Sequence, residues 1–419
     1  MTAGHELLVV GLGYVGTPLA LRAARAGLST AGLDIDPSVI GTLAGRRSHV
    51  AGVSDADIAE LYRRGFTAST DPAVVSAADT VVLCVPTGLT PGRAPDLGPL
   101  RAASTAVGTH LRPGTLVVVE STSFPGTTEE IVLPILEQRS GLRAGEDFYL
   151  AFAPERIDPG NTRFGLADTP KVVGGHTPLC AKYCATFYGR FVDTVVVARG
   201  TREAELSKLL ENTYRFVNIA LVNEFARFCE TTGIDVWDVL HCAGTKPFGF
   251  ASFTPGPGVG GHCIPVDPLY LTSKAAESGF TFTTVEAART VNDRVPGHVV
   301  RRAVGLLGDR RVAGASVLLL GVAYKADVPD VRESPAAPIA AGLLDLGAEV
   351  AYHDPHVPRF AAGGRALRRE TDLRAAAERA DITILLQHHR EYDPVLLASA
   401  ARLLLDTRGR ISGSHVQYL

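Results

Sequence analysis

The sequence lacks the features that mark membrane-spanning, secreted and nucleic-acid-binding proteins. No apolar run is as long as a membrane span, and the first residues lack the basic stretch of a signal peptide. The 41 basic and 44 acidic side chains leave a formal net charge of −3, whereas a general nucleic-acid binder carries a basic excess. We therefore expect no membrane partner and no nucleic-acid partner.

Cysteine is sparse as well, with six residues, and none of them forms a Cys-x-x-Cys pair. This spacing argues against a zinc ribbon or a redox dithiol, so no metal site is predicted. Cysteines scattered through a long chain are typical of a reducing cytosol, which predicts a cytoplasmic location.

The residues that are present make an ordinary globular composition, with 46% hydrophobic and 20% charged residues. A chain of 419 residues is long enough to bury a large core without disulfides. At about 150 residues per domain, two or three domains are expected.

The first part of the chain, residues 1–195, alternates short apolar runs with helical stretches. Residues 7–10 form an apolar run that ends at glycines, residues 18–26 are rich in Ala, Leu and Arg, and a second apolar run ends at Leu33. This order predicts a strand, a glycine turn, a helix and a second strand. Further runs with the length of parallel strands lie at 80–85, 116–120 and 149–153. We therefore predict a doubly wound α/β domain.

A long helix over 201–231 is predicted for the next region, residues 196–298, which we expect to be a central helical domain. The predicted apolar face of this helix consists of Leu206, Leu209, Leu210, Thr213, Val217 and Ala220. The stretch 248–268 is rich in glycine and proline, which indicates a loop.

The last region, residues 299–419, predicts a second α/β domain. Strands are expected at 317–320 and 350–353, and a helix is expected to start at Ser334 and Pro335, with Ser as its N-cap.

Two segments of this last region echo the first domain. Residues 380–385 read Ala-Asp-Ile-Thr-Ile-Leu where residues 78–83 read Ala-Asp-Thr-Val-Val-Leu, and Asp354-Pro355 follows an apolar run as Asp34 does. The echoes suggest two related Rossmann-like nucleotide-binding folds joined by a helix. Alternatively, any two parallel sheets share apolar strands flanked by Asp.

A dinucleotide site is predicted between the first strand and the first helix. Gly11 permits a tight turn, Gly13 lets the backbone approach a pyrophosphate, and Gly16 lets helix and strand pack closely. Asp34, about 20 residues on, can accept hydrogen bonds from ribose hydroxyls and would repel a 2′-phosphate, which favours NAD over NADP. The alternative is a glycine-rich turn with a solvated Asp.

Further polar residues follow predicted strands, at the sheet edge where ligands bind. Thr87 and Thr122 could hydrogen-bond a cofactor or water, although capping of a turn explains each almost as well. Glu155-Arg156 in the first domain, and a second group after residue 320, could hold a diphosphate or a ribose. That second group consists of Lys325, Asp327, Asp330 and Arg332. A salt-bridged surface turn is the alternative for both groups.

The chemical candidates are a cysteine in the glycine-rich loop and a polar stripe on the long helix. Cys263 is flanked by His262 and followed by Asp267. The pKa of a free thiol is about 8.5, so a nucleophilic thiolate needs positive charge or a helix N-terminus nearby. The residues alone leave catalytic and structural roles of Cys263 equally open. Lys208 and Asn212 share one helix face and could clamp an oxyanion.

Glu205 and Arg215 extend this stripe. A solvated helix face is the usual interpretation of such a pattern.

Taken together, these residues resemble the UDP-glucose/GDP-mannose dehydrogenase family of nucleotide-sugar 6-dehydrogenases over nearly the whole chain. The motifs that carry the resemblance are Gly11-Leu12-Gly13-Tyr14-Val15-Gly16, Val85-Pro86-Thr87, Glu120-Ser121-Thr122, Pro154-Glu155-Arg156, Glu205-Leu206-Ser207-Lys208-Leu209-Leu210-Glu211-Asn212, the loop around Cys263, Gly321-Val322-Ala323-Tyr324-Lys325 and Arg332-Glu333-Ser334-Pro335.

The resemblance implies an NAD-dependent four-electron oxidation of the C6 alcohol of a nucleotide-linked hexose to a uronic acid. It implies that Cys263 forms a thiohemiacetal and then a thioester, that Lys208 and Asn212 stabilise the oxyanion, and that Asp267 handles water and orients Lys208. The other residues with implied roles are Glu155 and Thr122 near substrate, water and nicotinamide; Gly11, Gly13, Tyr14, Val15, Gly16, Asp34, Thr87 and Arg332 at the cofactor; and Arg156, Phe253, Gly260 and Lys325 at the sugar nucleotide.

The resemblance also implies a homodimer formed through the long helix, with a substrate site that takes residues from the neighbouring subunit. The domains would then be 1–195 for NAD, 196–298 for dimerisation and the catalytic loop, and 299–419 for the UDP moiety.

Two departures bear on the sugar. His262 precedes the cysteine and Ile264-Pro265-Val266 follows it, where UDP-glucose dehydrogenases usually have Ser before the Cys and Phe-x-Lys after it. Asp158-Pro159-Gly160 stands where those enzymes carry a Glu. Both features resemble the branch that acts on UDP-N-acetylhexosamines, with UDP- or dTDP-glucose as the alternative substrate. A two-electron hydroxyacid-type dehydrogenase and a non-catalytic NAD-binding sensor are the rival functions.

Overall fold

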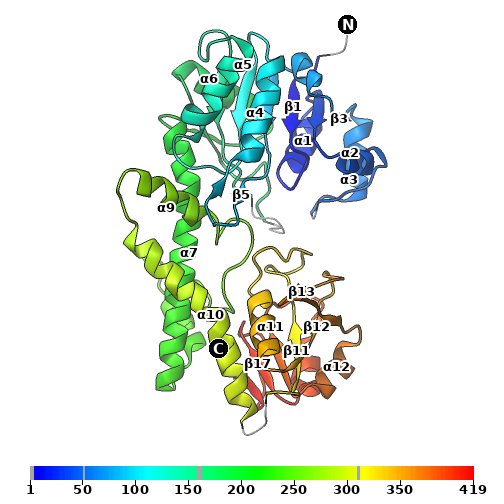
Figure 1. Cartoon of the computed structure of the whole chain (residues 1–419), viewed down its shortest axis with the longest axis vertical. Helices are drawn as coiled ribbons and strands as arrows, with labels where there is room; N and C mark the ends of the chain where they lie inside the picture. The colour runs from blue at the N-terminus through cyan, green and yellow to red at the C-terminus, as the bar shows by residue number, and fades with distance from the viewer. Residues whose placement is uncertain (1–3, 51, 158–162, 309–311) are drawn as a thin grey trace. The chain divides into compact units, whose positions relative to one another are not determined.

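The computed structural model describes residues 4–50, 52–157, 163–308 and 312–419, and the chain divides into two compact units. Unit 1 comprises Met1–Glu211 and Leu269–Phe280, and unit 2 comprises Asn212–Pro268 and Thr281–Leu419 (Figure 1). Within the described ranges, no helix is both long enough and apolar enough to cross a membrane.

Unit 1 is built on a sheet whose described strands follow the order β10-β9-β8-β7-β4-β1-β2-β3. These strands are β1 (Leu7–Val10), β2 (Thr30–Leu33), β3 (Thr67–Ser69), β4 (Thr80–Leu83), β7 (Leu116–Val119), β8 (Tyr149–Phe152), β9 (Lys171–Gly175) and β10 (Val195–Val197). From β3 to β8 all neighbours are parallel, in the order of a doubly wound dinucleotide fold whose ligand edge lies between β1 and β4. The predicted fold class is confirmed.

The far end of this sheet departs from the parallel pattern. Strand β9 runs antiparallel to β8, and β10 runs parallel to β9. These two strands were not predicted from the sequence, because an apolar run shows no direction. A short hairpin of β5 (Gly88–Leu89) and β6 (Pro95–Asp96) follows β4.

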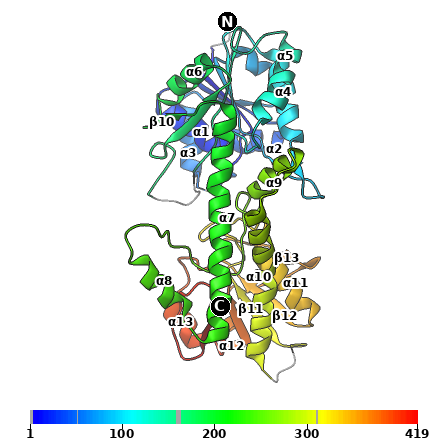
Figure 2. The same cartoon turned by 90° about the vertical axis from the view of Figure 1, so that its left-hand side faces the viewer.

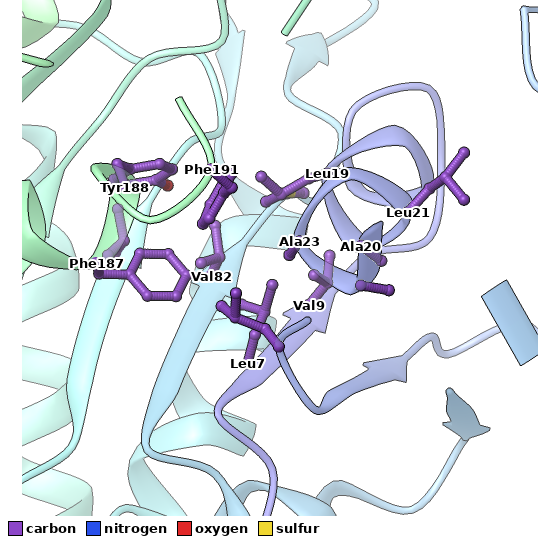
Figure 3. Close-up of a cluster of buried hydrophobic side chains, with 14 of the residues drawn as sticks. Leu7, Val9, Leu19, Ala20, Leu21, Ala23, Val82, Phe187, Tyr188 and Phe191 are labelled. Atoms are coloured by element: carbon purple, nitrogen blue, oxygen red, sulfur yellow. The ribbon is translucent and has the colours of Figure 1, made fainter. Parts of the chain in front are cut away.

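Helices cover both faces of the sheet because its strands are apolar on both sides. One face of the sheet packs on α1 (Gly16–Arg25) and α6 (Pro178–Tyr188) through an apolar cluster. Outside this cluster, α4 (Gly98–His110) packs on α5 (Leu133–Ser140). Figure 3 shows the first cluster, which includes Leu7, Val9, Leu19, Ala20, Ala23, Val82, Phe187, Tyr188 and Phe191. Further helical segments are α2 (Pro37–Ala44), α3 (Asp55–Arg63), the 3₁₀-helix η1 (Pro72–Ala77) and the π-helix η2 (Thr127–Val132).

The long helix α7 (Thr201–Thr232) is found where the sequence predicts it, and the boundary between the units falls inside it. In unit 2, α7 packs side by side with α10 (Thr283–Leu307) through the apolar cluster around Phe216, Ala220 and Ala288 (Figure 2). The Asn292 side chain donates to the Phe216 carbonyl at 3.2 Å. The other helices of the central region are α8 (Val236–Gly244) and α9 (Asp267–Glu277).

The predicted apolar face of α7 is wrong in part. Leu209 and Ala220 are buried, but Leu206 is 43% exposed and Leu210 is 65% exposed. The 3.6-residue period does not distinguish one broad apolar face from a core face that adjoins a second, exposed apolar stripe.

Unit 2 carries a second sheet in the order β15-β12-β11-β16-β17-β18. Its strands are β11 (Ser316–Leu320), β12 (Glu349–His353), β15 (Arg368–Arg369), β16 (Ile382–Leu385), β17 (Leu404–Asp406) and β18 (Val416–Tyr418). All neighbours are parallel, so the sheet repeats the 3-2-1-4-5-6 order of the first domain. The two predicted Rossmann-like folds are therefore both present.

Alternation along β11 places its side chains in two cores. Val317 and Leu319 pack with α10 and with α11 (Ala336–Asp345), whereas Leu318 and Leu320 pack with α12 (Leu373–Arg379) and α13 (Pro394–Ala400). A small hairpin of β13 (Ala361–Ala362) and β14 (Arg365–Ala366) lies beside α11.

Helix α11 starts one residue later than predicted. Pro335 occupies the cap position, and the Ser334 hydroxyl accepts the Ala336 N–H at 3.2 Å while donating to the Val322 carbonyl at 2.7 Å. Ser334 is thus used to tie the loop after β11 to the helix start.

Candidate active site

The glycine loop between β1 and α1 has the geometry of a pyrophosphate cradle. Gly11 has φ +94°, and a Cβ there would lie 2.7 Å from the Cys84 carbonyl oxygen. A Cβ on Gly16 would lie 1.9 Å from the Gly11 carbonyl oxygen, whereas one on Gly13 would meet no atom within 4 Å. Gly11 and Gly16 are thus required for packing, and Gly13 faces open space at the start of α1. This division matches the glycine roles of dinucleotide-binding loops.

Tyr14 and Val15, which complete this loop, are exposed and half-buried, respectively. Helix α1 has no side-chain cap and no acidic residue in its first turn, so its N-terminal N–H groups present positive potential.

Asp34 follows β2 at the same sheet edge and remains partly exposed. One carboxylate oxygen accepts the Leu12 N–H at 2.8 Å, and the other accepts the Asp36 N–H at 3.0 Å. A carboxylate has about four acceptor positions, so both oxygens can still accept ribose hydroxyls. The loop and Asp34 therefore fit a dinucleotide without a 2′-phosphate.

Thr87 and Thr122 follow β4 and β7 at the carboxyl edge of the sheet. Thr87 is buried and Thr122 is half-buried. The Ser121 hydroxyl next to Thr122 donates to the Val85 carbonyl at 2.7 Å, which joins the two loops.

Glu155 and Arg156 follow β8 at this edge and have different partners. One Glu155 oxygen accepts the N–H groups of Arg156 and Ile157, at 2.8 and 2.6 Å. The Arg156 guanidinium pairs with Glu211 at 2.6 Å and donates to the Pro170 carbonyl. Arg156 is thus held in an ion pair within unit 1.

A buried polar cluster that was not predicted from the sequence contacts Glu155. Lys171 Nζ lies 2.6 Å from Glu120 Oε1 and 3.5 Å from Glu155 Oε2, and the Tyr188 hydroxyl donates to Glu120. The only local signal is a lysine that opens the apolar run of β9. Its partners are separated from it by 51 and 16 residues along the chain, so sequence spacing could not indicate them.

The predicted polar stripe on α7 divides between two environments. Glu205 is fully buried and accepts hydrogen bonds from the N–H groups of Gly126 and Thr128 and from the Thr128 hydroxyl, at 2.6–2.8 Å. Burial raises the pKa of Glu205 to about 7. A solvated helix face is therefore wrong for Glu205, although Arg215 on the same helix is exposed.

In unit 2, Asn212 and Asp267 form a buried pair. The Asn212 side-chain amide donates to Asp267 at 2.5 Å, and Asp267 is 1% exposed. This contact joins α7 to the first residue of α9. Lys208 lies one turn earlier on α7 and is half-buried.

Cys263 is exposed at the turn that leads into α9. Its carbonyl accepts the N–H groups of Val266 and Asp267, at 3.2 and 2.9 Å, so the cysteine lies one turn before the first residue of that helix. An exposed thiol beside a helix N-terminus is in an environment typical of reactive cysteines. His262, next to it, is half-buried.

The glycines of the cysteine loop allow it to approach the segment after β11. A Cβ on Gly260 would lie 2.7 Å from Tyr324 Cβ, and Gly261, with φ +88°, donates its N–H to the Arg332 carbonyl at 2.9 Å. Gly260, a predicted substrate residue, is thus required for close packing within unit 2.

The remaining predicted substrate and cofactor residues of unit 2 lie on loops. Phe253 is half-buried with its ring 5.7 Å from that of Tyr214, and Lys325 is half-buried. Arg332 is exposed and pairs with Asp330 at 2.6 Å. Asp158-Pro159-Gly160, on which one sugar argument was based, lies outside the described residues.

In the described part of the chain, one group of metal-binding residue types converges: Asp327, His356 and His389. Both nitrogens of His389 are already engaged, because Nδ1 accepts the Asp327 N–H at 2.9 Å and Nε2 faces Asp354 at 3.1 Å. This histidine supports the buried Asp354 carboxylate, and we assign no metal to the group.

Three models of one family match this sequence. The NAD binding domain of the UDP-glucose/GDP-mannose dehydrogenase family matches residues 5–192, the central domain matches 202–294, and the UDP binding domain matches 318–412.

Individual relatives cover most of the chain. A UDP-N-acetyl-D-glucosamine 6-dehydrogenase of Pseudomonas aeruginosa is 38% identical over 84% of this chain and 83% of its own length. An NDP-N-acetyl-D-galactosaminuronic acid dehydrogenase of Ralstonia solanacearum is 35% identical over 98% and 97%.

Solved structures give the same result for the fold. A UDP-D-ManNAc dehydrogenase from Pyrococcus horikoshii superimposes with a TM-score of 0.89 at 31% identity, covering 98% of both chains. A UDP-glucose dehydrogenase from Pyrobaculum islandicum reaches the same TM-score at 27% identity, covering 99% of this chain and 97% of its own. The fold is thus shared by enzymes named for different sugars. This chain belongs to the UDP-glucose/GDP-mannose dehydrogenase family and is an NAD-dependent nucleotide-sugar dehydrogenase.

Proposed function

We propose that this enzyme oxidises the C6 primary alcohol of a UDP-N-acetylhexosamine to the uronic acid, with Cys263 as the nucleophile. The observation that carries the proposal is the exposed Cys263 thiol at the N-terminal end of α9, one helical turn before the buried Asp267–Asn212 pair. The N-acetylhexosamine is supported by the names of the relatives from Pseudomonas, Ralstonia and Pyrococcus, and by the residues around the cysteine.

The cofactor supplies one kind of chemistry: each bound NAD⁺ accepts one hydride from the substrate's C6 and leaves as NADH. Gly11, Gly13, Tyr14, Val15 and Gly16 would hold the pyrophosphate, Asp34 the ribose, and Thr87, Thr122 and Arg332 further parts of the cofactor.

The first oxidation turns the alcohol into an aldehyde, with the hydroxyl proton passing to solvent. The Cys263 sulfur then adds to the aldehyde carbon, and the carbonyl oxygen takes up a proton, which gives a thiohemiacetal. Loss of a second hydride and the hydroxyl proton leaves a thioester, and water cleaves its C–S bond to release the carboxylate and restore the thiol. Covalent capture retains a reactive aldehyde and presents a second C–H bond for oxidation.

Residues of α7 would stabilise the oxyanion that forms in these steps. We assign this role to Lys208 and Asn212, at about 3 kcal/mol per donor as in comparable sites. The hydrogen bond to Asp267 fixes the orientation of the Asn212 amide, and Asp267 would also position water. Glu155 and Thr122 would place substrate and water.

The nucleotide end of the substrate would bind unit 2 through Lys325, with Phe253 and Gly260 near the sugar and Arg156 as a further contact. We propose domains at 1–195, 196–298 and 299–419, which the three matched family models support. We also propose a homodimer formed through α7, which exposes an apolar stripe that comprises Leu206, Leu210, Tyr214, Leu221, Phe225 and Phe228.

The stoichiometry of NADH tests the reaction. Purified enzyme, NAD⁺ and single UDP-sugars should give two NADH per molecule consumed with UDP-N-acetylhexosamines, and less turnover with UDP- or dTDP-glucose. One NADH per molecule would instead indicate a two-electron dehydrogenase of the hydroxyacid type.

Cys263→Ser tests the nucleophile. We expect uronate formation to fall by at least about 1,000-fold, because a serine hydroxyl is a much poorer nucleophile than a thiolate at neutral pH. The measurement is product analysis by mass spectrometry, with NAD⁺ affinity as the check that the fold is intact. Cys242, also exposed, gives the matched control, and Cys242→Ser should retain activity. Full uronate formation by Cys263→Ser would refute the covalent mechanism.

A further inference from the structure

The reversed strand β9 brings a lysine to the ligand edge of the first sheet. Glu120 follows β7 and Glu155 follows β8, so both lie at the carboxyl ends of parallel strands. Strand β9 is antiparallel to β8, which places its first residue, Lys171, at that same edge. A parallel strand in this position would have delivered its last residue instead.

The three side chains form a buried chain of contacts within unit 1. Lys171 Nζ lies 2.6 Å from Glu120 Oε1 and 3.5 Å from Glu155 Oε2, and the lysine and Glu120 side chains are 6% and 0% exposed. The Tyr188 hydroxyl donates to Glu120 Oε1 at 2.5 Å, and the Cys84 thiol lies 3.7 Å from Glu120 Oε2.

Opposite charges explain why Lys171 lies between Glu120 and Glu155. Burial alone would lower the pKa of Lys171, but the carboxylates of Glu120 and Glu155 raise it above its ordinary value, so the lysine stays charged. Glu120 is buried and contacts Lys171, Tyr188 and Cys84, so it anchors the lysine. Glu155 is more exposed, at 16%, and is the member of the chain that faces the sheet edge.

Glu155 is thereby held at both carboxylate oxygens. Oε1 accepts the N–H groups of Arg156 and Ile157, and Oε2 faces Lys171. Contacts at both oxygens restrict the rotation of this carboxyl group.

We propose that Lys171 is a positioning residue for the oxidation: anchored by Glu120 and Tyr188, it holds the Glu155 side chain in one orientation toward the reacting groups. This inference rests on the function proposed above, in which Glu155 places substrate and water. The groups that face the cluster are Cys84 after β4, Glu120 after β7, Lys171 on β9, and Cys184 and Tyr188 on α6.

The test separates this role from simple neutralisation of Glu120. Lys171→Met alone leaves a buried carboxylate without its cation and can unfold the domain. The double variant Lys171→Met/Glu120→Gln removes one charge of each sign, keeps an acceptor for Tyr188, and leaves Glu155 unchanged. Lys171→Arg is the conservative variant, and Lys274→Met is the matched control, because Lys274 also contacts two carboxylates, Glu130 and Glu277, on the surface.

The first measurement needs no substrate. The Glu155 carboxyl is followed by NMR with ¹³C-labelled glutamate, and its signal is identified by its loss in Glu155→Gln. We expect one sharp signal in wild type and in Lys274→Met, and a shifted or broadened signal in the double variant, because the Glu155 Oε2 atom has lost its cationic neighbour. An unchanged signal in the folded double variant would overturn the proposal, whatever the enzyme's substrate is.

The second measurement is kcat and KM with UDP-N-acetylhexosamine. We expect kcat of the double variant to fall roughly 10- to 100-fold with KM little changed, and Lys171→Arg to recover most of the rate. Wild-type kcat and KM in the double variant would show that Lys171 only neutralises Glu120. If the wild type oxidises no UDP-sugar, the proposed function fails, and the NMR measurement still decides the role of Lys171.

Discussion

Three glycines in one turn serve different purposes, as their surroundings show. Gly11 and Gly16 are surrounded by backbone of the loop and of the strand beside it, whereas the position of a Cβ on Gly13 is empty for 4 Å. The steric roles of Gly11 and Gly16 could be predicted from the sequence, because the pattern of glycines between strand and helix has a known steric basis. The role of Gly13 at a pyrophosphate stays a prediction.

This difference predicts opposite results for two alanine substitutions. Gly16→Ala should destabilise the protein by about 1–3 kcal/mol or more, because its Cβ would overlap the Gly11 carbonyl oxygen. Gly13→Ala should keep its stability within about 0.5 kcal/mol of wild type and weaken NAD⁺ binding, since the methyl would fill the space of the pyrophosphate. Urea unfolding and calorimetric titration with NAD⁺ measure the two effects. Equal affinity of Gly13→Ala and wild type for NAD⁺ would place the cofactor elsewhere.

Single residues at the same sheet edge were predictable to different degrees. Thr87, Thr122 and Glu155 follow apolar runs that could be recognised as parallel strands. Lys171 could not be assigned to this edge, because its position depends on the reversed direction of β9, and strand direction is set by the tertiary connection.

At the scale of elements, Glu205 joins α7 to the π-helix η2. Its carboxyl accepts the N–H groups of Gly126 and Thr128 at the start of η2, where backbone donors lack partners within the helix. The length of α7 could be predicted almost to the residue from its composition. The contacts of its faces could not be predicted, since the partners of Glu205 lie 77 and 79 residues away along the chain.

Glu205 gives the folding stability a pH dependence. Its pKa is about 7 in the fold and 4.5 ordinarily, with burial as the main cause, so its stabilising contribution is complete below pH 4.5 and is lost as pH rises through 7. Glu205→Gln cannot ionise. Between pH 5 and pH 8 we therefore expect wild type to lose on the order of 2 kcal/mol of unfolding free energy relative to this variant. Urea unfolding at several pH values tests this, and parallel curves would mean that the hydrogen bonds keep Glu205 ionised.

At the scale of the whole molecule, two sheets of the same strand order have different ligand edges. Asp34 and Asp354 both follow the second strand, and each accepts an N–H from the loop after the first strand at 2.8 Å. Asp354 is fully buried and also receives the N–H groups of Ala323, His356 and Val357 and the His389 ring. Of these two carboxylates, Asp34 keeps acceptor positions for a ribose, which agrees with the match of the NAD binding domain to residues 5–192.

The apolar stripe on α7 predicts a dimer. Phe225 is 52% exposed and Phe228 is 59% exposed, and they continue the stripe of Leu210, Tyr214 and Leu221 at helical spacing. Exposed apolar surface of this kind marks an interface. We predict that wild type forms a dimer of about twice 44.2 kDa and that Phe225→Glu/Phe228→Glu is monomeric, because four carboxylates would be desolvated in a symmetric interface.

Light scattering after gel filtration measures the mass, and Val395→Glu, which changes an apolar side chain that is 77% exposed on α13, is the control. The monomeric variant should still bind NAD⁺, since the glycine loop and Asp34 lie in unit 1. If the substrate site takes residues from the neighbouring subunit, the same variant should lose uronate formation. A monomeric variant with full activity would show that each chain carries a complete site, and a variant that remains dimeric would place the interface away from Phe225 and Phe228.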